Sequence, residues 1–150
     1  SEMCIRDRAS LFVISNGQKY KLLGSAQDYK KIYEKDLGPN TGGMGAFSPS
    51  PNISPEMEID ILKRIVSPTL KEMNDRGTPF CGILYIGLMI TKEGPKLIEY
   101  NVRLGDPECQ AVLARIKNNF LDICIALKKK NIKKYLINYH KQIPYDKSRF

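Results

Sequence analysis

The stretch that decides the fold is Lys96-Leu97-Ile98-Glu99-Tyr100-Asn101-Val102-Arg103-Leu104-Gly105-Asp106-Pro107-Glu108. It predicts a strand that turns abruptly into a helix. Successive side chains of a strand point to opposite faces, so Glu99, Asn101 and Arg103 are expected to project together, about 7 Å apart. The opposite face is expected to face the core and holds Ile98, Tyr100 and Val102.

The polar face of this strand carries a carboxylate, an amide and a guanidinium. Carboxylate and amide oxygens are ligands for a hard cation such as Mg²⁺, which also keeps phosphate oxygens of its substrate. A guanidinium stabilises charge on a phosphoryl group. The set therefore suits a magnesium polyphosphate, although any half-exposed strand alternates polar residues and the three alone leave that alternative open.

The residues after the strand predict a tight turn into a helix. Gly105 permits the turn, Asp106 is expected to cap the helix, Pro107 suits the first helical position and Glu108 suits the first turn. The end of the strand and the start of the helix should therefore be held together.

Three strings carry a family resemblance. Residues 25–31 read SAQDYKK, residues 38–49 read GPNTGGMGAFSP and residues 103–112 read RLGDPECQAV. In this order they resemble the phosphoribosylamine–glycine ligases, also called glycinamide ribonucleotide synthetases, which are ATP-grasp enzymes of purine synthesis. The resemblance covers roughly residues 9–127.

The resemblance implies an α+β fold, the C-terminal subdomain fragment of an ATP-grasp domain, with an antiparallel sheet flanked by helices. Residues 9–131 would be this part of the domain and residues 132–150 the start of a truncated C-terminal region. Residues 1–8 resemble translated adapter sequence and are expected to be a non-native leader. The N-terminal and C-terminal domains of the same enzyme would be missing partners, so we expect the chain alone to be inactive.

The resemblance also implies a reaction. The carboxylate of glycine would attack the γ-phosphate of ATP to give glycyl phosphate and ADP, and the amine of 5-phosphoribosylamine would then displace phosphate to form an amide. ATP and Mg²⁺ or Mn²⁺ are the implied cofactors. Charge control is the physical requirement, because a carboxylate and a triphosphate repel each other until cations intervene.

The implied site residues follow the motifs. Glu99 and Asn101 would hold the metal, and together with Arg103 they would contact the nucleotide. Arg103 and Asp106 would be catalytic. The implied substrate-binding residues are Lys30, Asn40, Thr41, Gly42, Gly43, Met44 and Gly45. On its own this glycine-rich segment is a weak signal, because it has neither a Walker sequence nor a Gly-x-Gly-x-x-Gly pattern.

The remaining pattern predicts secondary structure around these motifs. Residues 11–14 and 19–23 should form a hairpin about an Asn-Gly turn, residues 28–33 one helical turn, and residues 38–45 a loop. A helix should begin after Ser54, restart near residues 67–68 and end at Gly77. A strand over residues 81–90 should turn back into the strand of Glu99, and one amphipathic helix should cover residues 107–130.

Composition bounds the class of protein. Hydrophobic residues make up 42% and charged residues 27% of the 150-residue chain, and no apolar run approaches the ~20 residues of a membrane helix. We therefore expect a soluble, cytoplasmic protein with no membrane partner. Its four cysteines show no paired spacing and are expected to be reduced, and a single histidine leaves no cluster for zinc.

The net charge of +8 is concentrated in the C-terminal tail. Residues 128–150 hold eight lysines and arginines against one acid, which leaves +1 for the rest of the chain. Lysines at the end of a helix complement its dipole, so we expect no nucleic-acid partner.

Three alternatives stay open. Another ATP-grasp carboxylate–amine ligase should lack the string over residues 103–110. A noncatalytic phosphate-binding module would bind Mg-ATP without turnover. A nucleic-acid binder would depend on the lysines of residues 128–134 and would lose affinity steeply with salt.

Overall fold

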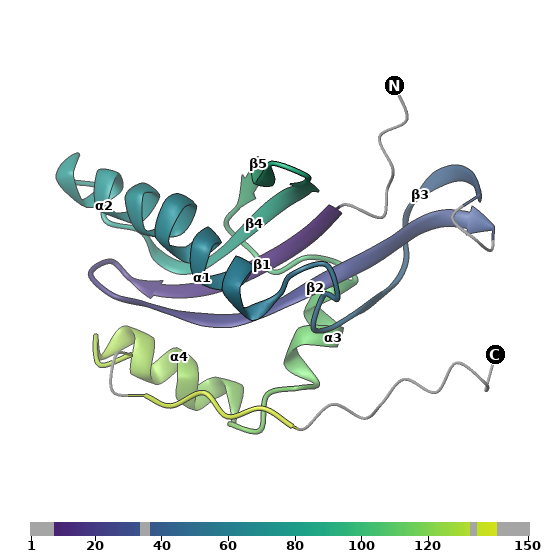
Figure 1. Ribbon diagram of the computed structural model, residues 1–150. Coiled ribbons are helices and arrows are strands. Elements are labelled where there is room, and N and C mark those ends of the chain that lie inside the picture. The colour runs from purple at the N-terminus through teal and green to yellow at the C-terminus, as the bar shows by residue number, and fades with distance from the viewer. Residues whose placement is uncertain (1–7, 34–36, 133–134, 141–150) are drawn as a thin grey trace.

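The computed structural model describes residues 8–33, 37–132 and 135–140. It contains one five-stranded sheet between two layers of helices (Figure 1). The strand order is β3-β2-β1-β4-β5, and every neighbouring pair is antiparallel. The α+β class with an antiparallel sheet flanked by helices is confirmed. Within the described residues, no helix is both long and apolar enough to cross a bilayer.

The hairpin of β1 (Arg8–Asn16) and β2 (Tyr20–Tyr33) forms around Asn16 and Gly17, as predicted. The side-chain oxygen of Asn16 accepts hydrogen bonds from the backbone N–H groups of Gln18 (3.1 Å) and Lys19 (2.8 Å). Gly17 has φ = +87°, a conformation that glycine adopts without steric cost. β1 begins at Arg8, while residues 1–7 of the expected leader lie outside the described residues.

Two predictions for residues 28–45 are wrong. Residues 28–33 do not form a helical turn but continue β2, and residues 38–45 are not a loop but part of β3 (Leu37–Phe47). Asp28 pairs with Ala46 and Tyr29 with Gly45 along this ribbon. Each of the two strands supplies backbone hydrogen bonds to the other. This pairing outweighs the weak strand propensity of a glycine-rich segment.

The predicted helix after Ser54 is confirmed. The Ser54 hydroxyl accepts a hydrogen bond from the N–H of Met57 (3.2 Å), and α1 (Pro55–Ile61) starts with a proline. A π-helical turn, η3 (Leu62–Val66), precedes Pro68, and α2 (Ser67–Asp75) continues beyond it. The restart near Pro68 agrees with the loss of a backbone donor at proline.

This helical layer covers one face of the sheet. Its apolar residues pack on alternate side chains of β1 and of β4 (Cys81–Thr91). The buried members of this first core are Ala9, Leu11, Val13, Ile53, Ile61, Val66, Leu70, Leu84, Ile86 and Leu88.

The second hairpin, β4 and β5 (Gly94–Asn101), is confirmed, but the expected core face of β5 is wrong. Ile98, Tyr100 and Val102 are 48%, 37% and 74% exposed. β5 is the edge strand, and its register shifts between the Gly87–Glu99 and Leu88–Leu97 pairs. An edge strand has neighbours on one side only, so its apolar side chains remain accessible here.

The single helix predicted over residues 107–130 is two helices. α3 (Glu108–Leu113) ends at Ala114, and α4 (Phe120–Lys128) begins after Asn119, whose side chain accepts from the N–H of Leu121 (2.9 Å). Asparagine competes for backbone hydrogen bonds and favours a helix start, which explains the break. Asp106 does not cap α3, because Pro107 occupies the capping position and makes no side-chain cap.

α3 and α4 cover part of the other face of the sheet. The buried residues of this second core are Phe12, Ile14, Leu23, Ala26, Val112, Ile116, Ile123, Ala126, Ile132 and Ile137. In Figure 1, α3 and α4 lie below the β1–β2 hairpin, and the ribbon of β2 and β3 extends beyond them. The polar site described next lies on this partly covered face.

Candidate functional site

A small pocket of about 40 Å³ opens on the partly covered face of the sheet. Four strands contribute to it: the start of β1, the middle of β2, β4 and β5. Its polar lining comprises Arg8, Ser10, Asp28, Lys30, Tyr85 and Glu99. Lys30 and Glu99 come from two motifs far apart in the sequence, so the fold brings these predicted residues together.

Glu99 and Asn101 lie on the same side of β5 at its end. Glu99 pairs with Gly87 and Asn101 with Tyr85 across the β4–β5 hairpin. A Cβ atom at Gly87 would lie 2.9 Å from Cγ of Glu99, so the glycine leaves room for this side chain against the sheet. The glutamate therefore has a defined place at the pocket.

These two residues fit a divalent cation that also binds phosphate. Mg²⁺ is usually held by one or two carboxylates, with substrate phosphates and water completing its shell. The described residues contain no cluster of three or more His, Cys, Asp or Glu side chains suited to a metal. A carboxylate and an amide oxygen on one strand end are a donor set for a substrate-bound metal rather than for a closed protein cage.

Lys30 lies beside Asp28 in the same pocket. Their charged atoms, Nζ of Lys30 and Oδ2 of Asp28, are 3.3 Å apart. The side chains are 35% and 13% exposed, so this ion pair is more shielded than the helix-surface pairs of the chain, such as Arg64 with Asp60. Shielding strengthens the Coulomb attraction but makes each charge costlier to leave unpaired.

Tyr85 places its hydroxyl among the acidic side chains of this face. Ser10 Oγ donates to Tyr85 Oη (2.8 Å), and Tyr85 Oη donates to Glu108 Oε1 (3.5 Å). The pKa of Tyr85 is raised to about 12, chiefly by burial, while the hydrogen bond with Ser10 lowers it and the negative charges of Glu108, Asp28 and Glu99 add to the increase. The phenol therefore stays protonated and serves as a hydrogen-bonding group.

Glu108 lies in the first turn of α3, as predicted, and is buried, with 4% of its surface exposed. A Cβ atom at Gly105 would overlap the Glu108 carboxylate, so the glycine leaves space for this carboxylate in its present position. Burial raises the pKa of Glu108, a hydrogen bond from its own backbone lowers it, and the negative charge of Asp28 raises it. Lys30 and the Tyr85 hydroxyl lower it in turn.

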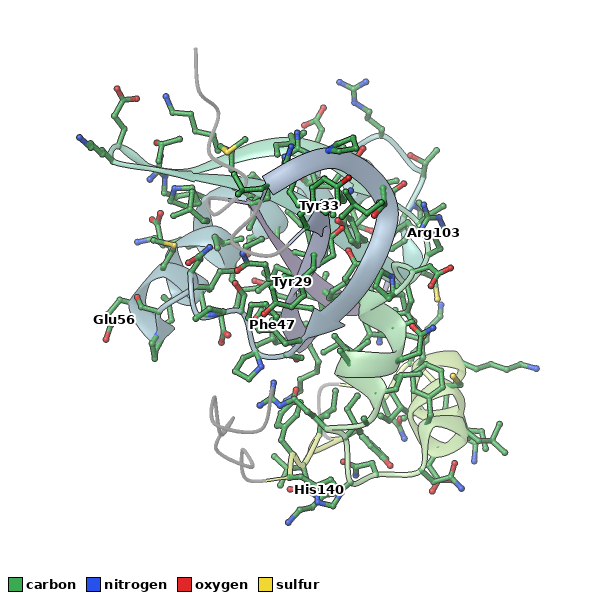
Figure 2. All side chains as sticks on the ribbon, turned by 90° about the vertical axis from the view of Figure 1, so that its right-hand side faces the viewer. Tyr29, Tyr33, Phe47, Glu56, Arg103 and His140 are labelled. Carbon is green, nitrogen blue, oxygen red and sulfur yellow. The ribbon has the colours of Figure 1, made fainter. Side chains whose placement is uncertain are left out.

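Of the predicted site residues that the structure describes, only Lys30 and Glu99 line this pocket, and Asn101 and the others lie outside it. Arg103 is exposed beyond the end of β5, and its Nη1 donates to the carbonyl of Leu104 (3.0 Å). Asp106 is exposed in the following turn. Figure 2 shows Arg103 to one side of the curled β2–β3 ribbon, along which Tyr29, Tyr33 and Phe47 lie. The prediction that Arg103 shares the strand face of Glu99 is wrong, because β5 ends at Asn101.

The glycine-rich residues belong to β3 beside this ribbon. Thr41 Oγ1 donates to the carbonyl of Lys30 (2.9 Å), and Gly45 pairs with Tyr29. Gly42 is exposed and has open space around its Cα. The side chains of Asn40 and Met44, and the surroundings of Gly43, lie outside the described residues.

Sequence reasoning missed Ser10, Asp28, Tyr85 and Glu108. Asp28 precedes Lys30 by two residues, and in a strand that spacing puts both on one face. The signal was hidden because this segment was expected to be helical. Tyr85 lies in an apolar run and Ser10 at the start of a strand, and neither position has a local pattern that indicates a site.

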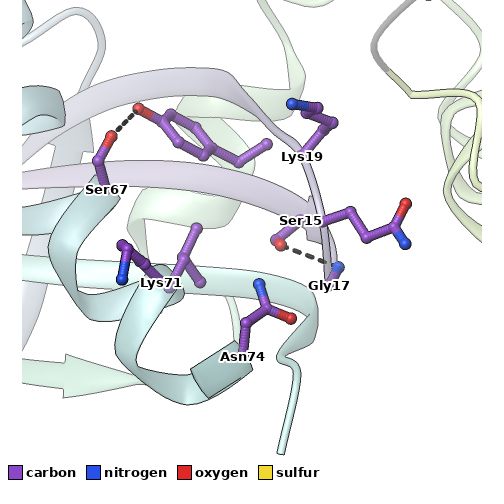
Figure 3. Close-up of a pocket in the computed structure, with 9 residues that line it drawn as sticks. Ser15, Gly17, Lys19, Ser67, Lys71 and Asn74 are labelled. Atoms are coloured by element: carbon purple, nitrogen blue, oxygen red, sulfur yellow. Dashed lines mark hydrogen bonds between the residues drawn. The ribbon is translucent and has the colours of Figure 1, made fainter. Parts of the chain in front are cut away.

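A larger pocket of about 190 Å³ lies elsewhere, between the β1–β2 turn and α2 (Figure 3). It shares no residue with the smaller pocket. Tyr20 Oη and Ser67 Oγ are hydrogen-bonded at 2.6 Å, and Ser15 Oγ accepts from the N–H of Gly17 (3.2 Å). Lys71 pairs with Asp75 within α2, so the Tyr20–Ser67 hydrogen bond is the one of these three contacts that joins the hairpin to the helix.

The sequence of the phosphoribosylglycinamide synthetase ATP-grasp (A) domain family matches residues 4–109. The chain belongs to this family. It is 50% identical over 115 residues to a phosphoribosylamine–glycine ligase of Brucella melitensis, covering 77% of this chain and 27% of that protein. It is 45% identical over 135 residues to one of Caldanaerobacter subterraneus, covering 88% and 32%. The chain thus spans about a third or less of these relatives.

Solved structures agree with the assignment to the phosphoribosylglycinamide synthetase ATP-grasp family. The phosphoribosylamine–glycine ligase of Thermotoga maritima superposes with a TM-score of 0.73 at 32% identity, over 82% of this chain and 31% of that one. An L-amino acid ligase of Bacillus licheniformis superposes at 0.53 with 18% identity, over 84% and 31%, and shows the fold alone. The predicted family and ATP-grasp fold are confirmed.

Proposed function

We propose that this chain is the C-terminal part of the ATP-grasp domain of a phosphoribosylamine–glycine ligase. The whole enzyme would join glycine to 5-phosphoribosylamine at the expense of ATP, through glycyl phosphate, in purine synthesis. The observation that carries this proposal is the convergence of Lys30 and Glu99 on one pocket. In the family, the first belongs to the proposed substrate motif and the second to the proposed metal motif.

The residues have separate tasks in this proposal. Glu99 and Asn101 would hold Mg²⁺ or Mn²⁺, which when bound neutralises negative charge on the triphosphate. Lys30 would face the acid substrate from β2, on the other side of the pocket. Arg103, exposed just beyond the strand, would contact the phosphates, and its planar guanidinium suits phosphate oxygens.

The remaining proposed roles concern substrate positioning. Asp106 and the β3 residues 40–45 would orient glycine and 5-phosphoribosylamine, and the backbone of a glycine-rich strand permits close approach of a substrate. The domains that precede and follow this part in the longer relatives would supply the rest of the site. The proposed location is the cytoplasm, where free thiols such as Cys81, Cys109 and Cys124 stay reduced.

ADP release tests the proposal directly. We define a hybrid ligase in which residues 9–131 of this chain replace the matching segment of the Thermotoga maritima enzyme. With Mg-ATP, glycine and freshly made 5-phosphoribosylamine, we expect the hybrid to turn over and the 150-residue chain alone to be silent. Binding of Mg-ATP by a folded hybrid without turnover would favour a noncatalytic phosphate-binding module.

A matched pair of variants locates the metal ligand. Glu99→Gln keeps the shape of the side chain but removes its charge, so we expect ADP release by the hybrid to fall about 100-fold. Glu93→Gln changes the same residue type in the exposed turn of the same hairpin, where Glu93 pairs with Lys96, and should leave the rate unchanged. Equal rates in both variants would contradict the role of Glu99.

A further inference from the structure

The ion pair between Asp28 and Lys30 is unlike the other ion pairs of the described residues. Both side chains line the pocket from β2, and the side chain of Asp28 is 13% exposed. In the other described pairs the acid side chains are 38–77% exposed, as for Asp60 with Arg64. Among these ion pairs, the one between Asp28 and Lys30 therefore has the least exposed acid side chain.

Asp28 has a second acidic neighbour that limits where the lysine can go. Glu108 is buried on α3, which packs against β2, and its ionisation responds to the charges of both Asp28 and Lys30. Glu108 is itself held by the hydroxyl of Tyr85 and by the space that Gly105 leaves for it. Asp28 and Glu108 thus attract the ammonium of Lys30 toward the β2 side of the pocket, across from Glu99.

A lysine side chain has four flexible bonds and loses conformational entropy when it is fixed. Its ammonium carries three N–H donors, so a single carboxylate partner leaves donors for a substrate. The carboxylate of Asp28 also offsets the positive charge of Lys30. The lysine therefore offers the pocket N–H donors with a defined direction rather than a net positive charge. Such an arrangement orients one anionic group beside Glu99.

We propose that Asp28 is a positioning residue, which fixes the ammonium of Lys30 so that it contacts the carboxylate of the amino-acid substrate. This inference rests on the proposed function, because it assigns the acid substrate to the Lys30 side of the pocket. Asp28 acts through Lys30 and does not itself touch the reacting atoms.

A double-mutant cycle in the hybrid ligase tests this role. We expect Asp28→Asn to raise the KM for glycine about tenfold with little change in the KM for ATP. The ammonium of Lys30 would no longer be held in place to donate to the substrate carboxylate, and losing one such charged hydrogen bond is worth about that factor. In a Lys30→Gln background, Asp28→Asn should have no further effect, since residues that act as a unit are not additive. Asp28→Glu should restore part of the loss.

The control variant is Asp60→Asn on α1. It breaks the exposed ion pair between Asp60 and Arg64 and should leave both KM values unchanged. A readout independent of turnover is the NMR signal of lysine ammonium groups in the 150-residue chain. An ordered Lys30 signal should be present and should be lost in Asp28→Asn but kept in Asp60→Asn.

The outcomes separate the two proposals. An inactive but folded hybrid overturns the proposed function, while the ammonium signal still tests the contact between Asp28 and Lys30. An active hybrid in which Asp28→Asn and Lys30→Gln have additive effects overturns the positioning role. An unchanged Lys30 signal in Asp28→Asn overturns it as well.

Discussion

The two faces of the sheet differ although the same strands build both. On the face toward α1, η3 and α2, β1 contributes Ala9, Leu11 and Val13, all buried. On the other face the same strand contributes Ser10, followed by Phe12 and Ile14. The first face is apolar along its length, while the second changes from polar at Ser10 to apolar where α3 and α4 cover it.

The difference fits a division between residues that stabilise the fold and residues of the proposed binding site. Covered apolar side chains supply the free energy of burial, about 25 cal/mol per Å². The uncovered end of the second face holds Asp28, Lys30 and Glu99 around a pocket, where charged groups are accessible to a ligand. Substitutions on the two faces should therefore separate loss of stability from loss of activity.

The largest effect is expected on the fully covered face. Ile86 is buried in the first core, so Ile86→Ala should lower the free energy of unfolding by about 2–5 kcal/mol, through lost burial and the cavity it leaves. Urea unfolding of the 150-residue chain measures this. Ile98→Ala, on the exposed edge strand, is the matched control and should cost far less. Equal losses would mean that β5 is covered in solution.

A smaller effect is expected one residue further along β4, on the other face. Gly87→Ala places a methyl group against Cγ of Glu99, and this flexible side chain can move aside. We expect the free energy of unfolding to change little, while the Mg²⁺ concentration for half-maximal ADP release by the hybrid rises about tenfold because the proposed metal ligand Glu99 is displaced. An unchanged Mg²⁺ requirement would contradict the proposal that the present position of Glu99 is important for metal binding.

The smallest effect is expected at Glu108, and it depends on pH. Burial raises the pKa of Glu108 above its ordinary value of 4.5, so the folded protein keeps this proton to a higher pH than the unfolded chain does. Stability contributed by this group is complete below pH 4.5 and declines as the pH rises through the raised pKa. The free energy of unfolding of Glu108→Gln, relative to the natural chain, should therefore increase from pH 4.5 to 7.

Urea unfolding at several pH values measures this trend. The control is Glu93→Gln, in the exposed turn of the β4–β5 hairpin, which should show no comparable increase. A constant difference between Glu108→Gln and the natural chain across this range would contradict a raised pKa for Glu108.

Local signals were enough for the elements with strong start and stop residues. The Asn16-Gly17 turn, the Ser54 cap with Pro55, and the β4–β5 hairpin were all predictable, because each depends on a few adjacent residues. Residues 28–45 were not, since their strands exist through pairing with each other. The break before Asn119 was missed because an apolar period alone does not show where helical hydrogen bonds are interrupted.

The candidate site divides in the same way. Glu99 and Asn101 were proposed for the site from their residue types and strand spacing, and Lys30 was proposed from the family resemblance. Asp28 and Glu108 were not assigned, since their importance depends on burial and on neighbours distant in sequence.

The amino-acid sequence by itself determined the family, the order of most elements and the residue types available for charge control. Only the tertiary structure decided that Glu99 and Lys30 share one pocket, that Arg103 lies beyond the strand, and that Glu108 is buried. The physical reason is that motifs and caps act over neighbouring residues. Burial, pairing and electrostatic environment arise from contacts between segments that the chain brings together when it folds.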